Sequence, residues 1–275
     1  MGCESKGMRV GRDRFRDRVA IVTGGSNGIG RAVTSALAAE GASVLVCDLV
    51  DSGFFDGNDK VATLVGDVAE TEFAAAAVTA ARDRYGRADI LVNDAASYPD
   101  GSLLEMAPAD WDRVFRVNVT GSFMMSQAFA RHCVAAGTGG AIVSISSGSA
   151  RSPRPGGAAY CSSKAALETM SKVFAMELGG CGIRVNVVAP GYIDVRGWSD
   201  ACPDRAPDAL RAALVDAIPL GTAGDPREVA SAVLFLASPE ASHITGAIID
   251  VDGGSGAGRF GLRSDMNAER ADVRG

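Results

Sequence analysis

The chain has 275 residues, of which 47% are hydrophobic and 22% are charged, a composition close to the globular average that excludes disorder throughout. Its formal net charge of −6 argues against a nucleic-acid-binding protein, because such proteins are usually basic. The sequence contains no run of about 20 apolar residues, the length that a membrane-spanning helix needs. We therefore expect a globular protein with no nucleic-acid partner and no membrane association.

Cysteine and histidine usage limits the kinds of site that the chain can build. The six cysteines include no CxxC pair, and the two histidines are His132 and His243. This pattern has neither zinc-ligand spacing nor the density of a disulfide scaffold, so we expect reduced thiols and no metal. The N-terminus lacks the apolar segment of a secretory signal, which favours a cytoplasmic location.

Apolar periodicity predicts that strands and helices alternate along the body of the chain. We expect buried strands at 19–23, 43–47, 61–65, 90–92, 141–145, 184–188 and 247–251. We expect helices at 29–40, 70–85, 108–135, 158–178 and 226–236. This alternation indicates βαβ units, so the expected fold class is α/β: a single-domain, doubly wound parallel sheet of about seven strands with helices on both faces.

Both ends of the chain and one internal segment depart from the alternation. Residues 1–17 mix charged residues and glycine without a period, and we interpret them as a flexible leader before a domain at 18–256. Residues 257–275 are similar and form an expected C-terminal tail. Residues 192–225 are irregular apart from one short helical patch, and such long connections are usually functional lids.

A glycine-rich loop follows the first strand. Residues 23–30 read Thr-Gly-Gly-Ser-Asn-Gly-Ile-Gly and lead into the first helix, the context of a dinucleotide-binding fingerprint. Gly24 permits the tight turn, Gly28 lets the backbone approach a pyrophosphate, and Gly30 lets the helix pack on the strand. The helix N-terminus offers unpaired N–H groups to the phosphates, so the loop predicts a Rossmann-type domain.

Asp48 closes the second strand, 24 residues after Gly24. A carboxylate there accepts hydrogen bonds from the ribose hydroxyls of NAD and repels the 2′-phosphate of NADP. No arginine or lysine occurs at 24–30 or 48–59 to bind that phosphate. The sequence therefore favours NAD as the cofactor.

Tyr160 and Lys164 are four residues apart on an expected helix and so share one of its faces. An ammonium near a phenol stabilises the phenolate, which lowers the phenol pKa and suits it to acid/base catalysis. Ser147 closes the preceding strand and can donate a hydrogen bond to a carbonyl or alkoxide oxygen. A Tyr-x-x-x-Lys pair alone is common on protein surfaces; here it accompanies Ser147 and the glycine-rich loop.

Over roughly residues 18–256 the sequence resembles the short-chain dehydrogenase/reductase family. The family's Thr-Gly-x-x-x-Gly-x-Gly stands at 23–30, and Ser147 precedes Tyr160 by 13 residues, as in the family. The other matching motifs are Asp67-Val68, Asn93-Asp94-Ala95-Ala96, Asn118 within Val-Asn-Val-Thr, Pro190-Gly191-Tyr192-Ile193 and Val251-Asp252-Gly253-Gly254.

The resemblance implies a catalytic tetrad of Asn118, Ser147, Tyr160 and Lys164. Tyr160 would exchange the substrate proton while Ser147 holds the reacting oxygen. Lys164 would bind the nicotinamide ribose and lower the pKa of Tyr160, Asn118 would hold a water in the proton path, and Ile193 would lie against the nicotinamide. The NAD-binding residues implied by the resemblance are Gly24, Ser26, Asn27, Gly28, Ile29, Gly30, Asp48, Asp67, Val68, Asn93, Ala95, Tyr160, Lys164, Pro190, Gly191 and Ile193.

The sequence departs from the family pattern in two places. Asp94 stands where the family usually has Asn, and Ala96 where it has Gly. The segment 49–60 is too short for the helix that the family usually places there, which leaves the adenosine edge more open.

The substrate pocket is expected to lie between Ser147, the Ser97–Tyr98 loop and the lid. Trp198 either contacts an apolar or cyclic substrate or packs the lid onto the body. Arg151 and Arg154 either meet a substrate carboxylate or are solvated loop charges. The lid also contributes Tyr192, Val195, Arg196, Arg205, Leu210, Arg211 and Leu214.

We expect an NAD(H)-dependent oxidoreductase that interconverts a secondary alcohol and its ketone on a small or cyclic substrate, such as a sugar or polyol, a cyclic alcohol or a secondary-metabolite intermediate. The family usually forms tetramers through the helices expected at 108–135 and 158–178, so a homotetramer is expected. The alternatives are a 3-oxoacyl-thioester reductase, which usually prefers NADPH, a non-catalytic NAD sensor, and a dehydratase or epimerase with bound NAD.

Overall fold

The computed structural model describes residues 13–199 and 208–258. Within them, parallel strands form one sheet in the order β3-β2-β1-β4-β5-β6-β7, which confirms the doubly wound fold. The chain order reverses between β1 and β4, and such a reversal opens a crevice at the carboxyl ends of the strands. The strands are β1 (Val19–Thr23), β2 (Ser43–Asp48), β3 (Val61–Val65), β4 (Ile90–Asn93), β5 (Gly140–Ile145), β6 (Ile183–Pro190) and β7 (Ile248–Val251).

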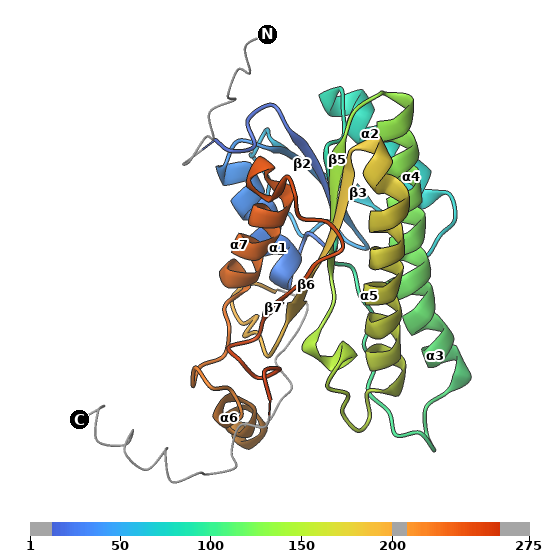
Figure 1. The fold of residues 1–275 in the computed structure, drawn as a ribbon. Coiled ribbons are helices and arrows are strands. Elements are labelled where there is room, and N and C mark those ends of the chain that lie inside the picture. The colour runs from blue at the N-terminus through green and yellow to red at the C-terminus, as the bar shows by residue number, and fades with distance from the viewer. Residues whose placement is uncertain (1–12, 200–207, 259–275) are drawn as a thin grey trace, which may run out of the picture.

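Helices cover both faces of the sheet (Figure 1). On one face lie α1 (Gly28–Ala39) and α7 (Pro226–Ala237), and on the other lie α2 (Phe73–Tyr85), α4 (Ser122–Ala135) and α5 (Ala158–Leu178). Each face has its own apolar core. Neighbouring residues of β1 serve opposite cores, since Ile21 packs toward α2 and α4 while Val22 packs toward α1 and α7. Strands buried on both faces explain the continuous apolar runs in the sequence.

The long helix expected at 108–135 is interrupted. The structure has α3 (Pro108–Phe115), a π-helical turn at Arg116–Gly121, and then α4. An apolar period cannot reveal one widened turn, because the residues on either side keep their helical spacing. The widened turn carries Asn118, and Ser122 donates to the Asn118 carbonyl oxygen at 3.0 Å. The interruption therefore lies at an expected catalytic residue.

The flexible leader expected over 1–17 is too long. Phe15 is 1% exposed within the α1–α7 core, and its N–H donates to the Glu40 carbonyl oxygen at 3.0 Å. Arg14 pairs with the side chains of Glu40 and Glu240. A single buried aromatic among charged residues has no periodicity, which is why the sequence did not indicate it. Residues 1–12 and 259–275 lie outside the described residues.

The two ends of the lid segment, residues 192–225, lie side by side. Ile193 forms a short parallel bridge with Gly224, and the expected helical patch is α6 (Asp208–Asp216). Pro226 occupies the first turn of α7, and Asp225 and Glu228 form a capping box at its start. Residues 200–207, including Arg205, lie outside the described residues. None of the helices within the described ranges is long and apolar enough to span a membrane.

Candidate active site

The glycine-rich loop turns from β1 into α1 at the carboxyl edge of the sheet. Gly24 and Gly28 have φ values of +69° and +54°, which favour glycine. A Cβ on Gly24 would lie 2.9 Å from the backbone nitrogen of Ala95. A Cβ on Gly30 would lie 2.2 Å from the Gly24 carbonyl oxygen. The loop is thus a bare backbone cradle at a helix N-terminus, and its shape fits a pyrophosphate. The N–H groups of Gly24, Ser26 and Gly28 are bound to oxygens of the protein.

The lid lies directly on this loop. The Gly28 N–H donates to the Trp198 carbonyl oxygen at 2.7 Å, and Val195 approaches the Cβ position of Gly28 at 3.7 Å. Trp198 is half-buried against the α1–α7 core. Of the two interpretations of Trp198, packing of the lid onto the body is the one that the structure supports.

Asp48 stands beside the loop as expected. Its carboxylate accepts the backbone N–H of Ser26 at 3.0 Å and that of Leu49 at 2.8 Å. Arg31 lies close by. The sequence analysis did not assign it to the site, because it follows the glycine-rich loop at 24–30 by one residue. Its Nε donates to the Ser26 carbonyl oxygen at 2.7 Å, and its guanidinium lies 4.2 Å from the ring centre of Phe54. Arg31 is 2% exposed, so the segment 49–60 covers the cation.

Further residues expected to bind the cofactor lie at the ends of β3 and β4. Asp67 accepts the N–H of Ala69 at 2.9 Å, and Val68 is buried. The Asn93 side chain donates to the hydroxyls of Ser126 and Ser144, at 3.1 and 3.4 Å. The side-chain nitrogen therefore links β4 to α4 and β5, while the buried side-chain oxygen of Asn93 has no hydrogen-bond partner among the described residues.

Ser147, Tyr160 and Lys164 converge beyond the end of β5. The Ser147 side chain interacts with Tyr160 and lowers the pKa of its phenol. The Lys164 nitrogen lies 5.7 Å from the Tyr160 ring centre and donates to the Ile145 carbonyl oxygen at 2.7 Å. Lys164 is 3% exposed. The fold brings together the three residues for which the sequence and the family resemblance implied a joint role.

Asn118 anchors the neighbouring loop. Its side chain accepts the Ser97 N–H at 2.7 Å and donates to the Ser97 carbonyl oxygen at 2.9 Å. It also donates to the Ser163 hydroxyl at 2.9 Å, and Ser163 is a neighbour of Lys164 on α5. Ser163 was missed in the sequence, although its position three residues after Tyr160 is a usable signal. Asn118 thus fixes the loop before Tyr98 against the helix that carries Tyr160.

The pKa of Tyr160 shifts in the direction opposite to the one expected. Burial raises the pKa of Tyr160, and the interaction with Ser147 only partly opposes this. The sequence had led us to expect a pKa lowered by Lys164. Burial also lowers the pKa of Lys164, while the attraction of Asp94 raises it. The site is therefore more enclosed than the spacing of its residues indicates.

Comparisons with known proteins agree with this geometry. A family model described as Enoyl-(Acyl carrier protein) reductase matches residues 24–256. A 3-oxoacyl-[acyl-carrier-protein] reductase of Thermotoga maritima is 37% identical over 248 residues, covering 88% of this chain and 98% of that protein. The chain belongs to the short-chain dehydrogenase/reductase family.

Two further members of the short-chain dehydrogenase/reductase family show how varied the named activities are. A (3R)-3-hydroxyacyl-CoA dehydrogenase of Mus musculus is 38% identical over 256 residues, covering 88% of this chain and 97% of that protein. A D-threitol dehydrogenase of Mycolicibacterium smegmatis is 36% identical over 252 residues, covering 88% of this chain and 94% of that protein. This chain is accordingly an oxidoreductase of a family that binds nicotinamide cofactors.

Two aromatic rings meet where the sequence predicts the substrate pocket. The Tyr98 ring meets the Tyr160 ring edge to face with centroids 6.2 Å apart, and Tyr98 is 58% exposed. The two loop arginines are paired within the protein. Arg154 binds Asp100 at 2.7 Å, and Arg151 binds Asp250 at 2.9 Å. Neither arginine therefore needs a substrate carboxylate to balance its charge.

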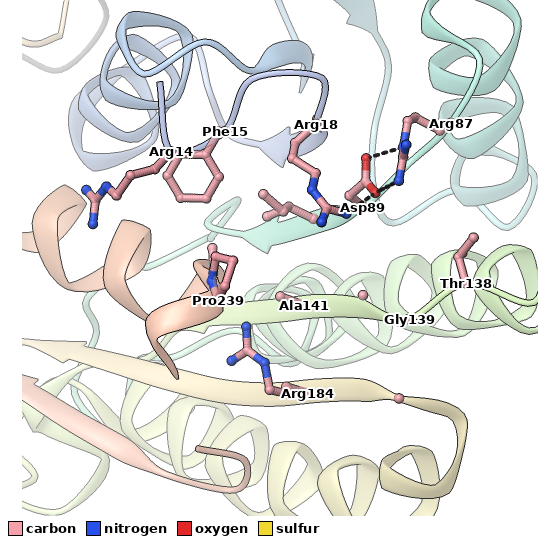
Figure 2. A pocket seen from close by; sticks show the side chains of 14 residues that line it. Arg14, Phe15, Arg18, Arg87, Asp89, Thr138, Gly139, Ala141, Arg184 and Pro239 are labelled. Atoms are coloured by element: carbon pink, nitrogen blue, oxygen red, sulfur yellow. Dashed lines mark hydrogen bonds and ion pairs between the residues drawn. The ribbon is translucent and has the colours of Figure 1, made fainter. Parts of the chain in front are cut away.

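A cavity of about 290 Å³ lies at the opposite, amino edge of the sheet and is lined by arginines (Figure 2). Their charges are met within the fold. Arg18 and Arg87 share the buried carboxylate of Asp89, and Arg184 donates to the Leu236 carbonyl oxygen at the end of α7. Arg14 has the glutamate partners described above. This cavity therefore lies at the opposite edge of the sheet from the candidate active site, which is at the carboxyl ends of the strands.

Proposed function

We propose that the protein is an NAD(H)-dependent oxidoreductase that interconverts a secondary alcohol and its ketone on a small or cyclic substrate. One arrangement carries the proposal: Ser147, Tyr160 and Lys164 lie together, with the Lys164 nitrogen 5.7 Å from the Tyr160 ring centre, beside a glycine-rich loop whose shape fits a dinucleotide. Gly24, Ser26, Asn27, Gly28, Ile29, Gly30 and the other residues implied by the resemblance would hold the cofactor.

The residues of the chain then have separate tasks in alcohol oxidation. Ser147 donates a hydrogen bond to the substrate oxygen, and Tyr160 as phenolate removes the hydroxyl proton. The carbinol C–H bond breaks as the C=O bond forms, and the hydride leaves with both electrons. The bound nicotinamide supplies the hydride acceptor. Lys164 supplies positive charge near the phenolate, and Asn118 is proposed to hold a water that carries the proton to solvent. Reduction of the ketone reverses each step.

NAD preference is supported by Asp48 and by the covering of Arg31. In the Asp48→Ala protein, we expect NAD affinity to fall roughly 10- to 100-fold, since a hydrogen bond to a charged group is worth about 1.5–3 kcal/mol. The ratio of NADP to NAD affinity should rise, because the repulsive carboxylate is gone. Isothermal titration calorimetry with both cofactors measures this. Asp51→Ala, a nearby exposed aspartate, is the control, and an unchanged ratio in Asp48→Ala would contradict the assignment.

A 3-oxoacyl-thioester reductase is the second candidate function. It is favoured by the names of two relatives, the Thermotoga maritima reductase and the mouse hydroxyacyl-CoA dehydrogenase. The D-threitol dehydrogenase favours a polyol instead. Asp48 weighs against the thioester reductase insofar as that activity uses NADPH.

An absorbance screen at 340 nm tests the proposed function. NAD or NADP is supplied with sugars, polyols, cyclic alcohols and hydroxy acids at about pH 9, and the reduced cofactors with ketones and 3-oxoacyl thioesters at about pH 6.5, on either side of the pKa expected for a tuned acid/base group. NADH formed from an alcohol supports the proposal. Activity confined to thioesters with NADPH would replace it by the second candidate. Silence despite cofactor binding would support the sensor.

A homotetramer is proposed from the outer surface of α4 and α5. Apolar side chains are exposed there, and a cavity of about 390 Å³ lies between the helices, lined by Phe123 and Phe174 among others. Light scattering after size-exclusion chromatography should give about four times 28.1 kDa. A mass of one or two chains would contradict the proposal. The exposed apolar residues are Phe123, Val134, Val173 and Met176.

A further inference from the structure

Asp94 is the first residue after β4, where the sheet ends beneath the glycine-rich loop. Its N–H and that of Ala95 both donate to Thr23 Oγ1, at 3.1 and 3.2 Å. Its carboxylate lies close to Gly30, in the first turn of α1, and interacts with the backbone there. A Cβ on Gly30 would lie 2.7 Å from Asp94 Oδ2. The backbone of Asp94 is therefore fixed to β1, and its carboxylate lies at the positive end of α1.

Lys164 reaches the same edge of the sheet from α5. Its ammonium is bound to the carbonyl oxygen of Ile145, the last residue of β5. β4 and β5 are parallel neighbours, with Asn93 opposite Ser144. The next residues along these strands are Asp94 and Ile145, and neighbouring strands lie about 5 Å apart. The register thus places the Asp94 backbone beside the carbonyl that holds the ammonium.

We propose that Asp94 is a positioning residue that acts through Lys164: its carboxylate balances the buried ammonium, keeps Lys164 charged, and so governs the charge state in which Tyr160 works. A buried ammonium without an opposite charge tends to lose its proton. Asn in place of Asp94 would have the same shape but no charge to offer Lys164. The inference deepens the proposed function and rests on the acid/base role proposed there for Tyr160.

Charged and titratable groups from several elements face this pair. Burial raises the pKa of Asp94, Lys164 lowers it, and Asp48 at the end of β2 raises it further. For Lys164, burial lowers the pKa and Asp94 raises it. Tyr160 has a pKa raised first by burial and then by Asp94 and Cys161, whereas Ser147 and Arg154 lower it.

The sign of the expected change follows from these interactions. Removing the negative charge of Asp94 withdraws support from the ammonium, so the pKa of Lys164 falls. It also removes a repulsion from the phenolate, so the pKa of Tyr160 falls too. A purely structural role for Asp94 predicts neither change.

The test uses the Asp94→Asn protein without cofactor, so it does not depend on turnover. The chain has four lysines, Lys6, Lys60, Lys164 and Lys172, and ¹³C-labelling at lysine Cε therefore gives a simple NMR spectrum. Arginine replacements of Lys60 and Lys172 assign their signals. The Lys164 midpoint should fall by about one pH unit or more in Asp94→Asn, the effect of losing a nearby opposite charge. The Tyr160 phenolate, followed by ultraviolet absorbance against Tyr160→Phe, should also form at lower pH.

Asp83→Asn is the matched control. Asp83 is an exposed carboxylate on α2 that pairs with Arg82, and its removal should leave the Lys164 midpoint unchanged. A midpoint that is unchanged or raised in Asp94→Asn overturns the inference. If Asp94→Asn does not fold, Asp94→Ser removes the charge, keeps an oxygen near Gly30, and is judged by the same midpoint.

Failure of this inference differs visibly from failure of the proposed function. If Tyr160→Phe keeps full turnover while the Lys164 midpoint falls in Asp94→Asn, the charge pairing stands and the acid/base role of Tyr160 does not. If the midpoint does not move and Tyr160→Phe is inactive, the acid/base role of Tyr160 stands and the charge pairing does not. If the charge pairing and the acid/base role both hold, the pH profile of alcohol oxidation should move to lower pH in Asp94→Asn.

Discussion

The Tyr160→Phe protein is expected to lose hydride-transfer turnover by about 10²- to 10⁴-fold, the contribution of a positioned acid or base. The change removes one oxygen from a half-buried ring, so the fold and the glycine-rich loop should survive. NAD affinity by calorimetry should therefore stay within a few-fold of wild type, while the initial rate at 340 nm collapses.

Tyr85→Phe is the matched control for this loss. The Tyr85 hydroxyl lies near the carbonyl oxygens of Val44 and Lys60, at 3.5 and 3.4 Å, at the amino edge of the sheet, whereas Ser147 lies beyond the carboxyl end of β5. Its removal should leave turnover unchanged. Undiminished turnover in Tyr160→Phe would contradict the acid/base assignment. Undiminished biological activity together with absent turnover would favour the NAD sensor.

The Gly30→Ala protein should lose both stability and cofactor affinity. The added methyl group would lie 2.2 Å from the Gly24 carbonyl oxygen and 2.7 Å from Asp94 Oδ2, so α1 must move away from β1. Overpacking of this kind costs about 1–3 kcal/mol, which denaturant unfolding measures. The displaced loop no longer presents its N–H groups to a pyrophosphate, and we expect NAD affinity to fall at least roughly tenfold, or about 1.4 kcal/mol.

Gly179→Ala separates this local clash from a general effect of alanine. Gly179 follows α5 with φ −56°, and no atom lies within 4 Å of its Cβ position. Stability and NAD affinity should both be retained there. Normal NAD affinity in a folded Gly30→Ala protein would show that the loop does not bind the pyrophosphate.

The fold was largely predictable because its signals are local. Five-residue apolar runs and glycine stops defined the strands, and the expected helix at 158–178 has the bounds observed for α5. The π turn at Asn118 was not predictable, because one widened turn leaves the apolar period intact on both sides. Phe15 was missed for the opposite reason, since one isolated aromatic has no period at all.

The sequence predicted which residues form the candidate site, but it did not predict the pKa shifts within the site. The resemblance to the family implied that Ser147, Tyr160 and Lys164 meet, and the fold brings them together. The pKa of Tyr160 depends on how deeply the ring is buried and on charges from other strands, above all Asp94. Arg31 lies beside Ser26 only because α1 folds back over the loop. Such effects arise from contacts between segments distant in sequence, which a linear pattern does not contain.

The packing of α1 against α7 has a consequence for how the chain reaches this structure. The two helices lie side by side on one face of the sheet, yet nearly 200 residues separate them (Figure 1). At a synthesis rate of about 5–20 residues per second, α1 waits roughly 10–40 s for its partner. During that time Leu37 and the neighbouring apolar side chains of α1 have no α7 to cover them. Contacts between residues so distant in sequence slow folding. We therefore expect the chain to be most prone to aggregation, and most dependent on chaperones, while its N-terminal half has been synthesised and α7 has not.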